Sequence, residues 1–152
     1  MWVWGENDFG QLGDNTRIDR SSPVQTIAGG TVWSKVSCNC GGSNTAAIKL
    51  NGTLWTWGRN DYGQLGDNTR ISKSSPVQTI AGGTNWSSVG CGQGHVVAIK
   101  TDGTLWTWGF NNYGQLGDGT SINKSSPVQT IIGGFNWNEI DTGYFNTAAI
   151  TF

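Results

Sequence analysis

The sequence has little charge and no excess of either sign. Only 12% of its 152 residues are charged, and nine Lys and Arg stand against ten Asp and Glu, so the formal net charge is -1. Such a chain has no basic field that would hold nucleic acid or an anionic membrane surface. We therefore expect neither nucleic acid nor a membrane as a partner.

Long apolar runs are missing as well. No stretch approaches the roughly 20 apolar residues that span a bilayer, and the N-terminus lacks the basic and apolar regions of a signal peptide. We expect the chain as expressed to be cytoplasmic, with its natural compartment left open.

Cysteine and histidine are scarce, with three and one residues respectively. An odd number of cysteines argues against a disulfide framework. A zinc site needs four ligands, and Cys38 and Cys40 have no second pair to complete one. We expect no metal, no cofactor and no catalytic residue, and we interpret the cysteines as small packing side chains.

Glycine and tryptophan, in contrast, are abundant, and they recur in a repeat. Trp4, Trp57 and Trp108 each begin a copy of WGxNxxGQLGDxT, which is followed by SSPVQTI, a Gly-Gly pair, another Trp and an apolar run ending in AI. Over the 30 positions from Trp4 and from Trp57, only five differ. This near-identity indicates a recent amplification or a designed sequence, with repeats at about 1–53, 54–103 and 104–152.

Each repeat predicts four short strands. In the middle copy they fall at residues 86–91, 95–101, 104–109 and 76–80, and the Asp-Gly pair at 102–103 predicts a tight hairpin. Four strands in about 50 residues are typical of a propeller blade, whose two apolar faces must be covered by neighbouring blades. The expected fold class is all-β, with β-propeller blades of four antiparallel strands and three repeats per chain.

The segment WxxVxCGxxHxxAI, followed by DGTLWTWG and NxxGQLGD, resembles the regulator of chromosome condensation repeat. The best match covers residues 86–118, and three copies extend it over the whole chain. The resemblance implies an inner strand of the WSSVGCG type, then HVVAIKT and TLWTWG, with SSPVQTI outermost. It also implies exchange-factor, ubiquitin-ligase or β-lactamase-inhibitor roles, but none of the functional residues of those proteins matches here.

Comparison of the three copies argues against catalysis. His95 corresponds to Asn44 and Asn146, and an amide can replace a hydrogen-bonding side chain but not a base or a metal ligand. We align Cys91 with Cys40 and with Thr142, and neither of those has a histidine beside it, which excludes a nucleophilic site. The repeated carboxylates are expected to cap their own loops; they are Asp14, Asp67 and Asp118.

The copies differ mainly on their loops, where a protein partner could be recognised. The variable positions include Glu6/Arg59/Phe110 and the turn Gly42-Ser43/Gln93-Gly94/Tyr144-Phe145. Exposed aromatic side chains are the best anchors for an interface, although ordinary surface variation is an alternative explanation. The candidate partner contacts are Phe110, Tyr144, Phe145, Arg59 and Glu6.

The two ends of the chain match complementary halves of one blade. MWVWG aligns with the third strand and NTAAITF with the second, so we expect residues 137–152 of one chain to pair with residues 1–27 of another. A homodimer with six blades is favoured over a homotrimer with nine, because propellers usually have four to eight. The residues expected to close the ring are Trp2, Trp4, Ala148, Ile150 and Phe152.

The favoured function is therefore a self-assembling propeller scaffold without catalytic activity. The alternatives are a protein-binding module, inhibitor-like or exchange-factor-like, that uses the variable loops, and a lectin-like ring in which repeated tryptophans stack on sugars.

Overall fold

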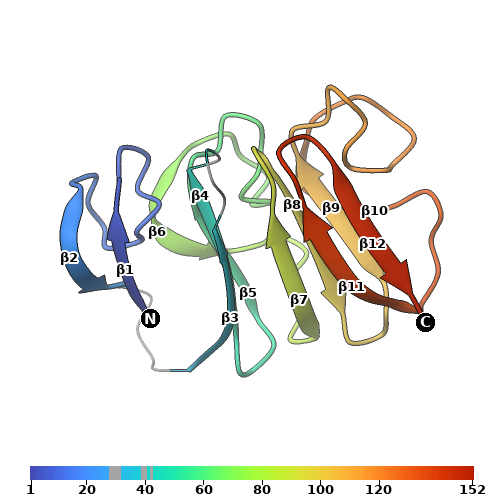
Figure 1. Ribbon diagram of the computed structural model, residues 1–152, viewed down its shortest axis with the longest axis horizontal. Coiled ribbons are helices and arrows are strands. Elements are labelled where there is room, and N and C mark those ends of the chain that lie inside the picture. The colour runs from blue at the N-terminus through green and yellow to red at the C-terminus, as the bar shows by residue number, and fades with distance from the viewer. Residues whose placement is uncertain (28–31, 39–40, 42) are drawn as a thin grey trace.

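The computed structural model describes residues 1–27, 32–38, 41 and 43–152. Within these ranges all regular structure is β, in twelve strands without a helix (Figure 1). The strands form two four-stranded and two two-stranded sheets, all paired antiparallel. The expected all-β fold with blades of four antiparallel strands is confirmed.

Two complete blades occupy the middle of the chain, each a sheet of four strands in sequence order. The first consists of β3 (Trp33–Cys38), β4 (Asn44–Lys49), β5 (Leu54–Gly58) and β6 (Lys73–Gln78). The second consists of β7 (Trp86–Cys91), β8 (His95–Lys100), β9 (Leu105–Gly109) and β10 (Lys124–Gln129).

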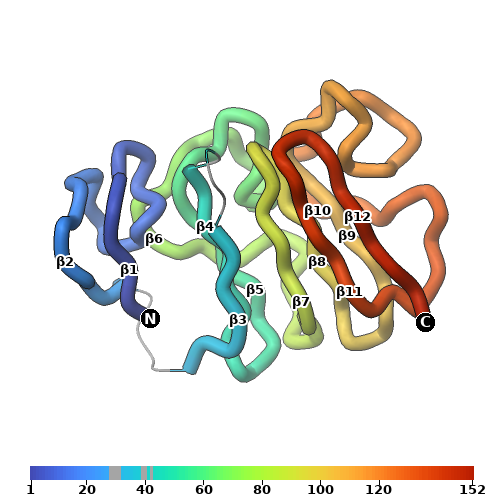
Figure 2. The backbone as a smooth tube through the Cα atoms, viewed as in Figure 1, coloured from blue at the N-terminus to red at the C-terminus, as the bar shows by residue number. Residues whose placement is uncertain are grey.

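Two half-blades flank the complete ones. The N-terminal half-blade pairs β1 (Trp2–Gly5) with β2 (Arg20–Gln25), and the C-terminal half-blade pairs β11 (Trp137–Thr142) with β12 (Thr147–Thr151). Followed along the tube in Figure 2, the sheets succeed one another in a row, and the two chain ends lie on opposite sides of the molecule.

The hairpin predicted at the Asp-Gly pair joins β8 to β9, and Asn51-Gly52 joins β4 to β5 in the same way. Gly52 and Gly103 have φ values of 75° and 77°, a conformation that suits glycine. The outer strand of the first blade begins at Lys73, earlier than expected, and contains Pro76. Proline is tolerated there because β6 is an edge strand of its sheet.

The core lies between the blades. Ala46, Ile48 and Leu54 of the first blade pack against Trp86, Val96, Ala98 and Trp108 of the second. The other face of the second blade presents Val97, Ile99 and Leu105 to Trp137, Ile140 and Ala149 of the C-terminal half-blade. Because successive residues of a strand point to opposite faces, β8 contributes to both cores, and each blade needs a neighbour on both sides.

The long loop between the third and fourth strands is built around a buried asparagine. Asn60 donates from Nδ2 to Asp67 Oδ1, Thr69 O, Thr69 Oγ1 and Ile71 O, each at 3.2 Å, and its Oδ1 accepts from the Leu65 amide at 2.9 Å. Asn7 and Asn111 make the same set of bonds. The expected capping role of the carboxylates is confirmed, since Asp67 Oδ1 accepts from the amide and hydroxyl of Thr69.

The alignment of Cys91 with Cys40 is wrong. Cys91 ends β7, and the residue that ends β3 is Cys38. The first copy has two more residues than the second between this cysteine and the start of the next strand, which displaced the alignment. Cys40 and Gly42 lie outside the described residues.

Candidate assembly interface

Side chains that are buried in the complete blades are exposed in the half-blades. Trp57 and Trp108 are 0% exposed, whereas Trp4, at the same repeat position, is 62% exposed. Ile48 and Ile99 are 2% exposed, whereas Ile150 is 56% exposed. The same residue types in the same strand positions therefore lack the neighbour that covers them elsewhere in the chain.

The half-blades also have unpaired strand edges. In the complete blades, β4 pairs with both β3 and β5, and β8 pairs with both β7 and β9. Within the described part of the chain, β12 pairs only with β11 and β1 only with β2. The edges of β12 and β1 thus offer backbone donors and acceptors to a further strand.

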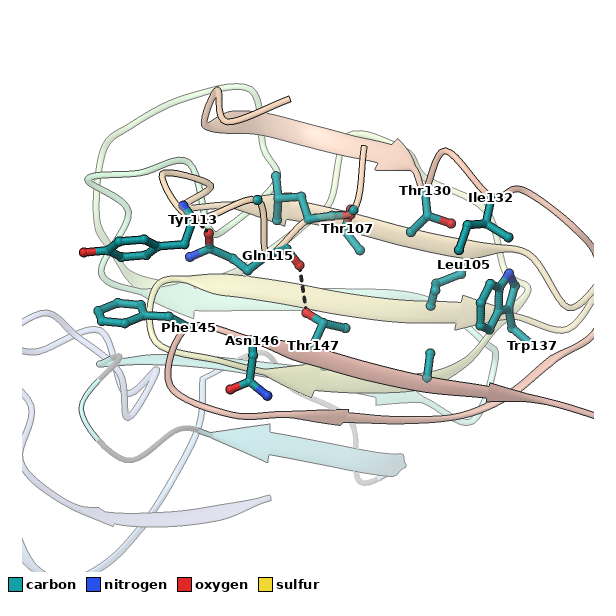
Figure 3. Close-up of a pocket in the computed structure, with 14 residues that line it drawn as sticks. Leu105, Thr107, Tyr113, Gln115, Thr130, Ile132, Trp137, Phe145, Asn146 and Thr147 are labelled. Atoms are coloured by element: carbon teal, nitrogen blue, oxygen red, sulfur yellow. Dashed lines mark hydrogen bonds between the residues drawn. The ribbon is translucent and has the colours of Figure 1, made fainter. Parts of the chain in front are cut away.

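A pocket of about 390 Å³ lies beside the C-terminal half-blade (Figure 3). Leu105, Ile132 and Trp137 lie toward one end of it, and Tyr113 and Phe145 lie toward the other. Between them, the Thr147 hydroxyl donates to the backbone oxygen of Gln115 at 2.8 Å. The pocket is mainly apolar and contains fixed hydrogen-bonding groups, as binding sites usually do.

A second pocket, of about 400 Å³, lies beside the N-terminal half-blade. Trp2 and Trp4 of β1 line it together with Val36 and Cys38 of β3. Four of the five residues expected to close a ring lie on β1 and β12, the strands that border these two pockets, and Phe152 directly follows β12. All five are exposed. They are Trp2 and Trp4 at one end, and Ala148, Ile150 and Phe152 at the other.

Aromatic side chains from separate loops gather into what we call the aromatic surface. Phe110 lies 4.7 Å from Tyr62 and 5.7 Å from Phe145, between ring centroids. Phe145 in turn lies 5.0 Å from Tyr113 and 4.8 Å from Tyr144. The structure thus brings the predicted Phe110, Tyr144 and Phe145 together. Sequence comparison missed Tyr62 and Tyr113, because every copy has an aromatic residue at that position.

Arg59 joins the aromatic surface, but Glu6 does not. The Arg59 guanidinium lies 5.0 Å from the ring centroid of Phe9 and 5.7 Å from that of Tyr62, which are cation-π distances. Its Nε also lies 2.7 Å from Asp61 Oδ2. Glu6 lines the N-terminal pocket, where its Oε1 accepts from Gln11 Nε2 at 3.5 Å.

His95 and Cys91 are buried and packed. His95 Nε2 lies 3.1 Å from the hydroxyl of Thr147, consistent with the hydrogen-bonding role expected from the sequence. Burial lowers the pKa of His95 to about 4 and raises the pKa of the Cys91 thiol to about 12, so both are neutral at pH 7. Among the described residues no three His, Cys, Asp or Glu side chains are grouped to hold a metal ion.

The family model of the "Regulator of chromosome condensation (RCC1) repeat" matches the chain three times, at residues 1–48, 51–99 and 102–150. The chain belongs to the RCC1 repeat family. The matches cover nearly all of the sequence, and the resemblance of its motifs to this repeat is confirmed.

Other RCC1-repeat proteins are similar over most of this chain. The ultraviolet-B receptor UVR8 of Arabidopsis thaliana is 35% identical over 131 residues, which are 85% of this chain and 29% of the receptor. The protein RCC2 homolog of Xenopus laevis is 34% identical over 135 residues, 85% of this chain and 26% of that protein. The RCC1-repeat chain thus spans less than a third of the length of each of these two relatives.

The solved structure of Prp20p from Saccharomyces cerevisiae has the same fold, with a TM-score of 0.81 at 20% identity. The match covers 99% of this chain and 40% of that one. RCC1-like blades of this kind are typical of protein-interaction and exchange-factor proteins. No helix in the described ranges has the length and apolar character needed to cross a membrane.

Proposed function

We propose that this RCC1-repeat chain is a non-catalytic protein-interaction scaffold that completes its own ring from two copies. The C-terminal half-blade of one copy and the N-terminal half-blade of the other form one four-stranded blade. Two such joints give a closed homodimer of six blades, within the usual range for propellers.

The observation that carries the proposal is that each half-blade has the strands the other lacks. β11 and β12 occupy the first and second strand positions, and β1 and β2 occupy the third and fourth. Their open faces expose Trp4 and Ile150, whose counterparts are buried between blades. Open strand edges beside exposed apolar side chains favour association, and the self-complementary arrangement directs it to a second copy.

A role in protein binding is supported by the described relatives. The structure report on Prp20p concerns its binding to Gsp1p and histones, both of them proteins. The lectin-like alternative has less support, because Trp57 and Trp108 are completely buried and cannot stack on a sugar. The buried, neutral His95 and Cys91 likewise favour a scaffold over an enzyme.

The native mass tests the assembly. Size-exclusion chromatography with light scattering at low micromolar concentration is expected to give twice the 16.3 kDa of one chain. Three times that mass would indicate the nine-bladed homotrimer instead. A folded monomer at this concentration would contradict the proposal.

The aromatic surface supports a second candidate function, the binding of a separate protein partner. Large aromatic side chains are enriched at interface hot spots. If this surface binds a partner, the Phe110→Ala/Tyr144→Ala double variant is expected to lose capture of that partner by the immobilised chain. An Ile18→Ala/Ile71→Ala variant is the control, since both residues are exposed and apolar but lie outside the aromatic surface. Equal capture by both variants would exclude the surface.

A further inference from the structure

We infer, on the basis of the self-assembly proposed above, that the third long loop is an open socket for one side chain, the indole of Trp4 from a second copy. The socket consists of three elements: the backbone oxygen of Gln115, the hydroxyl of Thr147, and Gly117, which has no Cβ to block the indole. The same chain contains two filled sockets with an equivalent backbone oxygen and glycine, the first of which also has the threonine hydroxyl, and they show how the third would be occupied.

The first filled socket holds Trp57. Its indole Nε1 donates to the backbone oxygen of Gln11 at 2.8 Å, and the same oxygen accepts from the Thr45 hydroxyl at 2.8 Å. The ring lies so close over Gly13 that a Cβ there would come within 2.7 Å of Nε1. A glycine is therefore required for the indole to enter.

The second filled socket holds Trp108, with Val96 opposite it in place of the threonine. Its Nε1 donates to the backbone oxygen of Gln64 at 2.9 Å, and a Cβ on Gly66 would lie 2.8 Å from Nε1. In both cases the tryptophan comes from the blade that follows the loop. The socket is thus the unit by which each long loop binds the next blade.

The third loop has the same shape, but no indole of the described residues lies in it. Gly117 has a φ of 62°, against 66° and 64° at Gly13 and Gly66. The nearest atom to a Cβ on Gly117 would be Thr130 Cγ2, at 3.7 Å. Among the described residues Thr147 donates to the Gln115 oxygen, as Thr45 does to Gln11, and the place of the second, indole donor is open.

Trp4 fits this place because its strand has the structure of the strands that carry the other two. β1 pairs with β2 through Trp2↔Gln25, Val3↔Val24 and Gly5↔Arg20, and β5 pairs with β6 through Trp55↔Gln78, Thr56↔Val77 and Gly58↔Lys73. In the first blade Trp57 lies opposite Thr45. The same register places Trp4 of the second copy opposite Thr147.

The outer strand supplies a second, independent match. The amides of Asn15 and Asn68 donate to the backbone oxygens of Ser74 and Ser125 in the following blade, at 2.9 and 2.8 Å. In the third loop this position is Gly119, and the repeat equivalent of those serines is Ser21 on β2. We therefore expect the Gly119 amide to donate to Ser21 of the second copy.

The inner strand β3 provides a chemical readout of docking, the accessibility of the Cys38 thiol. Cys91 is buried against the first blade, where its amide donates to Ser37 Oγ at 3.0 Å. Cys38 has the same strand position but is exposed. Docking of a second copy places that copy's Asp141, the repeat equivalent of Ser37, against Cys38 and covers its thiol.

The test uses a key variant, Trp4→Ala, and a socket variant, Gly117→Ala, in the full chain. Sedimentation velocity is expected to show a dimer dissociation constant about 100-fold higher for Trp4→Ala, as for a buried aromatic hot spot, and a clear increase for Gly117→Ala. Gly82→Ala is the matched control. Gly82 also has positive φ, at 55°, and Ile80 O lies 4.0 Å from its Cβ position, but Gly82 lies outside the socket. The dimer dissociation constant of the Gly82→Ala variant is expected to equal that of the wild type.

Mixing the two variants separates a docking role from a folding role. A mixed dimer contains one fully native joint, formed by Trp4 of the socket variant and Gly117 of the key variant. It is therefore expected to form more tightly than either homodimer. Variants that merely fold poorly would not rescue each other, and absence of rescue would overturn the inference.

Thiol labelling gives a second readout. All proteins compared carry Cys40→Ser, which removes the neighbouring thiol. The labelling rate of Cys38 is expected to fall as the protein concentration rises and more of the chain becomes dimeric. In the Trp4→Ala variant the rate is expected to stay high. A wild-type chain that stays monomeric would refute the assembly itself. A dimer that is insensitive to Trp4→Ala and Gly117→Ala would leave the assembly standing and refute this socket.

Discussion

Asn60→Asp is expected to lower the free energy of unfolding by about 3–5 kcal/mol, the range for a buried charge without a partner. Asn60 is completely buried, and its Nδ2 donates to four acceptors, one of them the carboxylate of Asp67. Aspartate has nearly the same shape but cannot donate, so its carboxylate would face these acceptors directly. Urea denaturation at one fixed protein concentration measures the loss.

Asn51→Asp is the matched control for this prediction. Asn51 is an exposed turn residue whose Oδ1 accepts from the amide and the hydroxyl of Thr53, at 3.2 and 2.7 Å. Asp102 makes the same two bonds to Thr104 in the next copy, at 3.0 and 2.6 Å. The control is expected to change stability by less than about 0.5 kcal/mol. Similar stabilities for the two variants would show that the long loop does not depend on Asn60.

The blades could be predicted from the sequence because their strands carry local signals. Alternating apolar residues, the Asp-Gly turn and the repeat period together determine a hairpin-rich sheet. The central role of Asn60 was missed, although WGxNxxG has this asparagine in all three copies. The glycines and carboxylates around Asn60 have familiar turn roles that a sequence reveals, whereas a single buried amide has no local sequence pattern.

The open faces could be predicted only in part. Trp4 and Ile150 were identified because repeat comparison shows which positions recur in the core. The socket opposite Trp4 was not, because its main hydrogen-bond acceptor is the backbone oxygen of Gln115, and backbone atoms leave no mark in the sequence. Gly117 could have been found, since a glycine stands at that position in every copy, but closely spaced glycines also occur in ordinary turns.

Acidification from pH 6.5 toward pH 4 is expected to destabilise the chain through His95. The Thr147 hydroxyl donates to Gln115, so it accepts from His95 Nε2, and the proton of the neutral ring lies on Nε2. Nδ1 is buried and has no hydrogen-bond partner in the described part of the chain. A second proton on Nδ1 would place a charge and an unsatisfied donor inside the blade.

The loss of stability is expected between pH 6.5 and about pH 4 because the pKa of His95 is lowered in the folded chain. Burial lowers the pKa of His95 from 6.5 to about 4, so the unfolded chain takes up the proton at a higher pH than the folded chain. The contribution of the neutral ring to stability is complete above pH 6.5 and is lost as the pH falls toward 4. Linkage converts this shift into a loss on the order of 3 kcal/mol.

His95→Asn provides the comparison, because Asn44 and Asn146 occupy the same position in the other two copies. Urea denaturation of both proteins between pH 7 and pH 4 is expected to show a steep loss of stability for wild type and a shallow one for the variant. The pKa of Asp14 is lowered from 3.8 to about 2, so its contribution is lost mainly below this window. If the two proteins lose stability in parallel between pH 6.5 and pH 4, His95 is not the group that titrates, and its ring is not held neutral by burial.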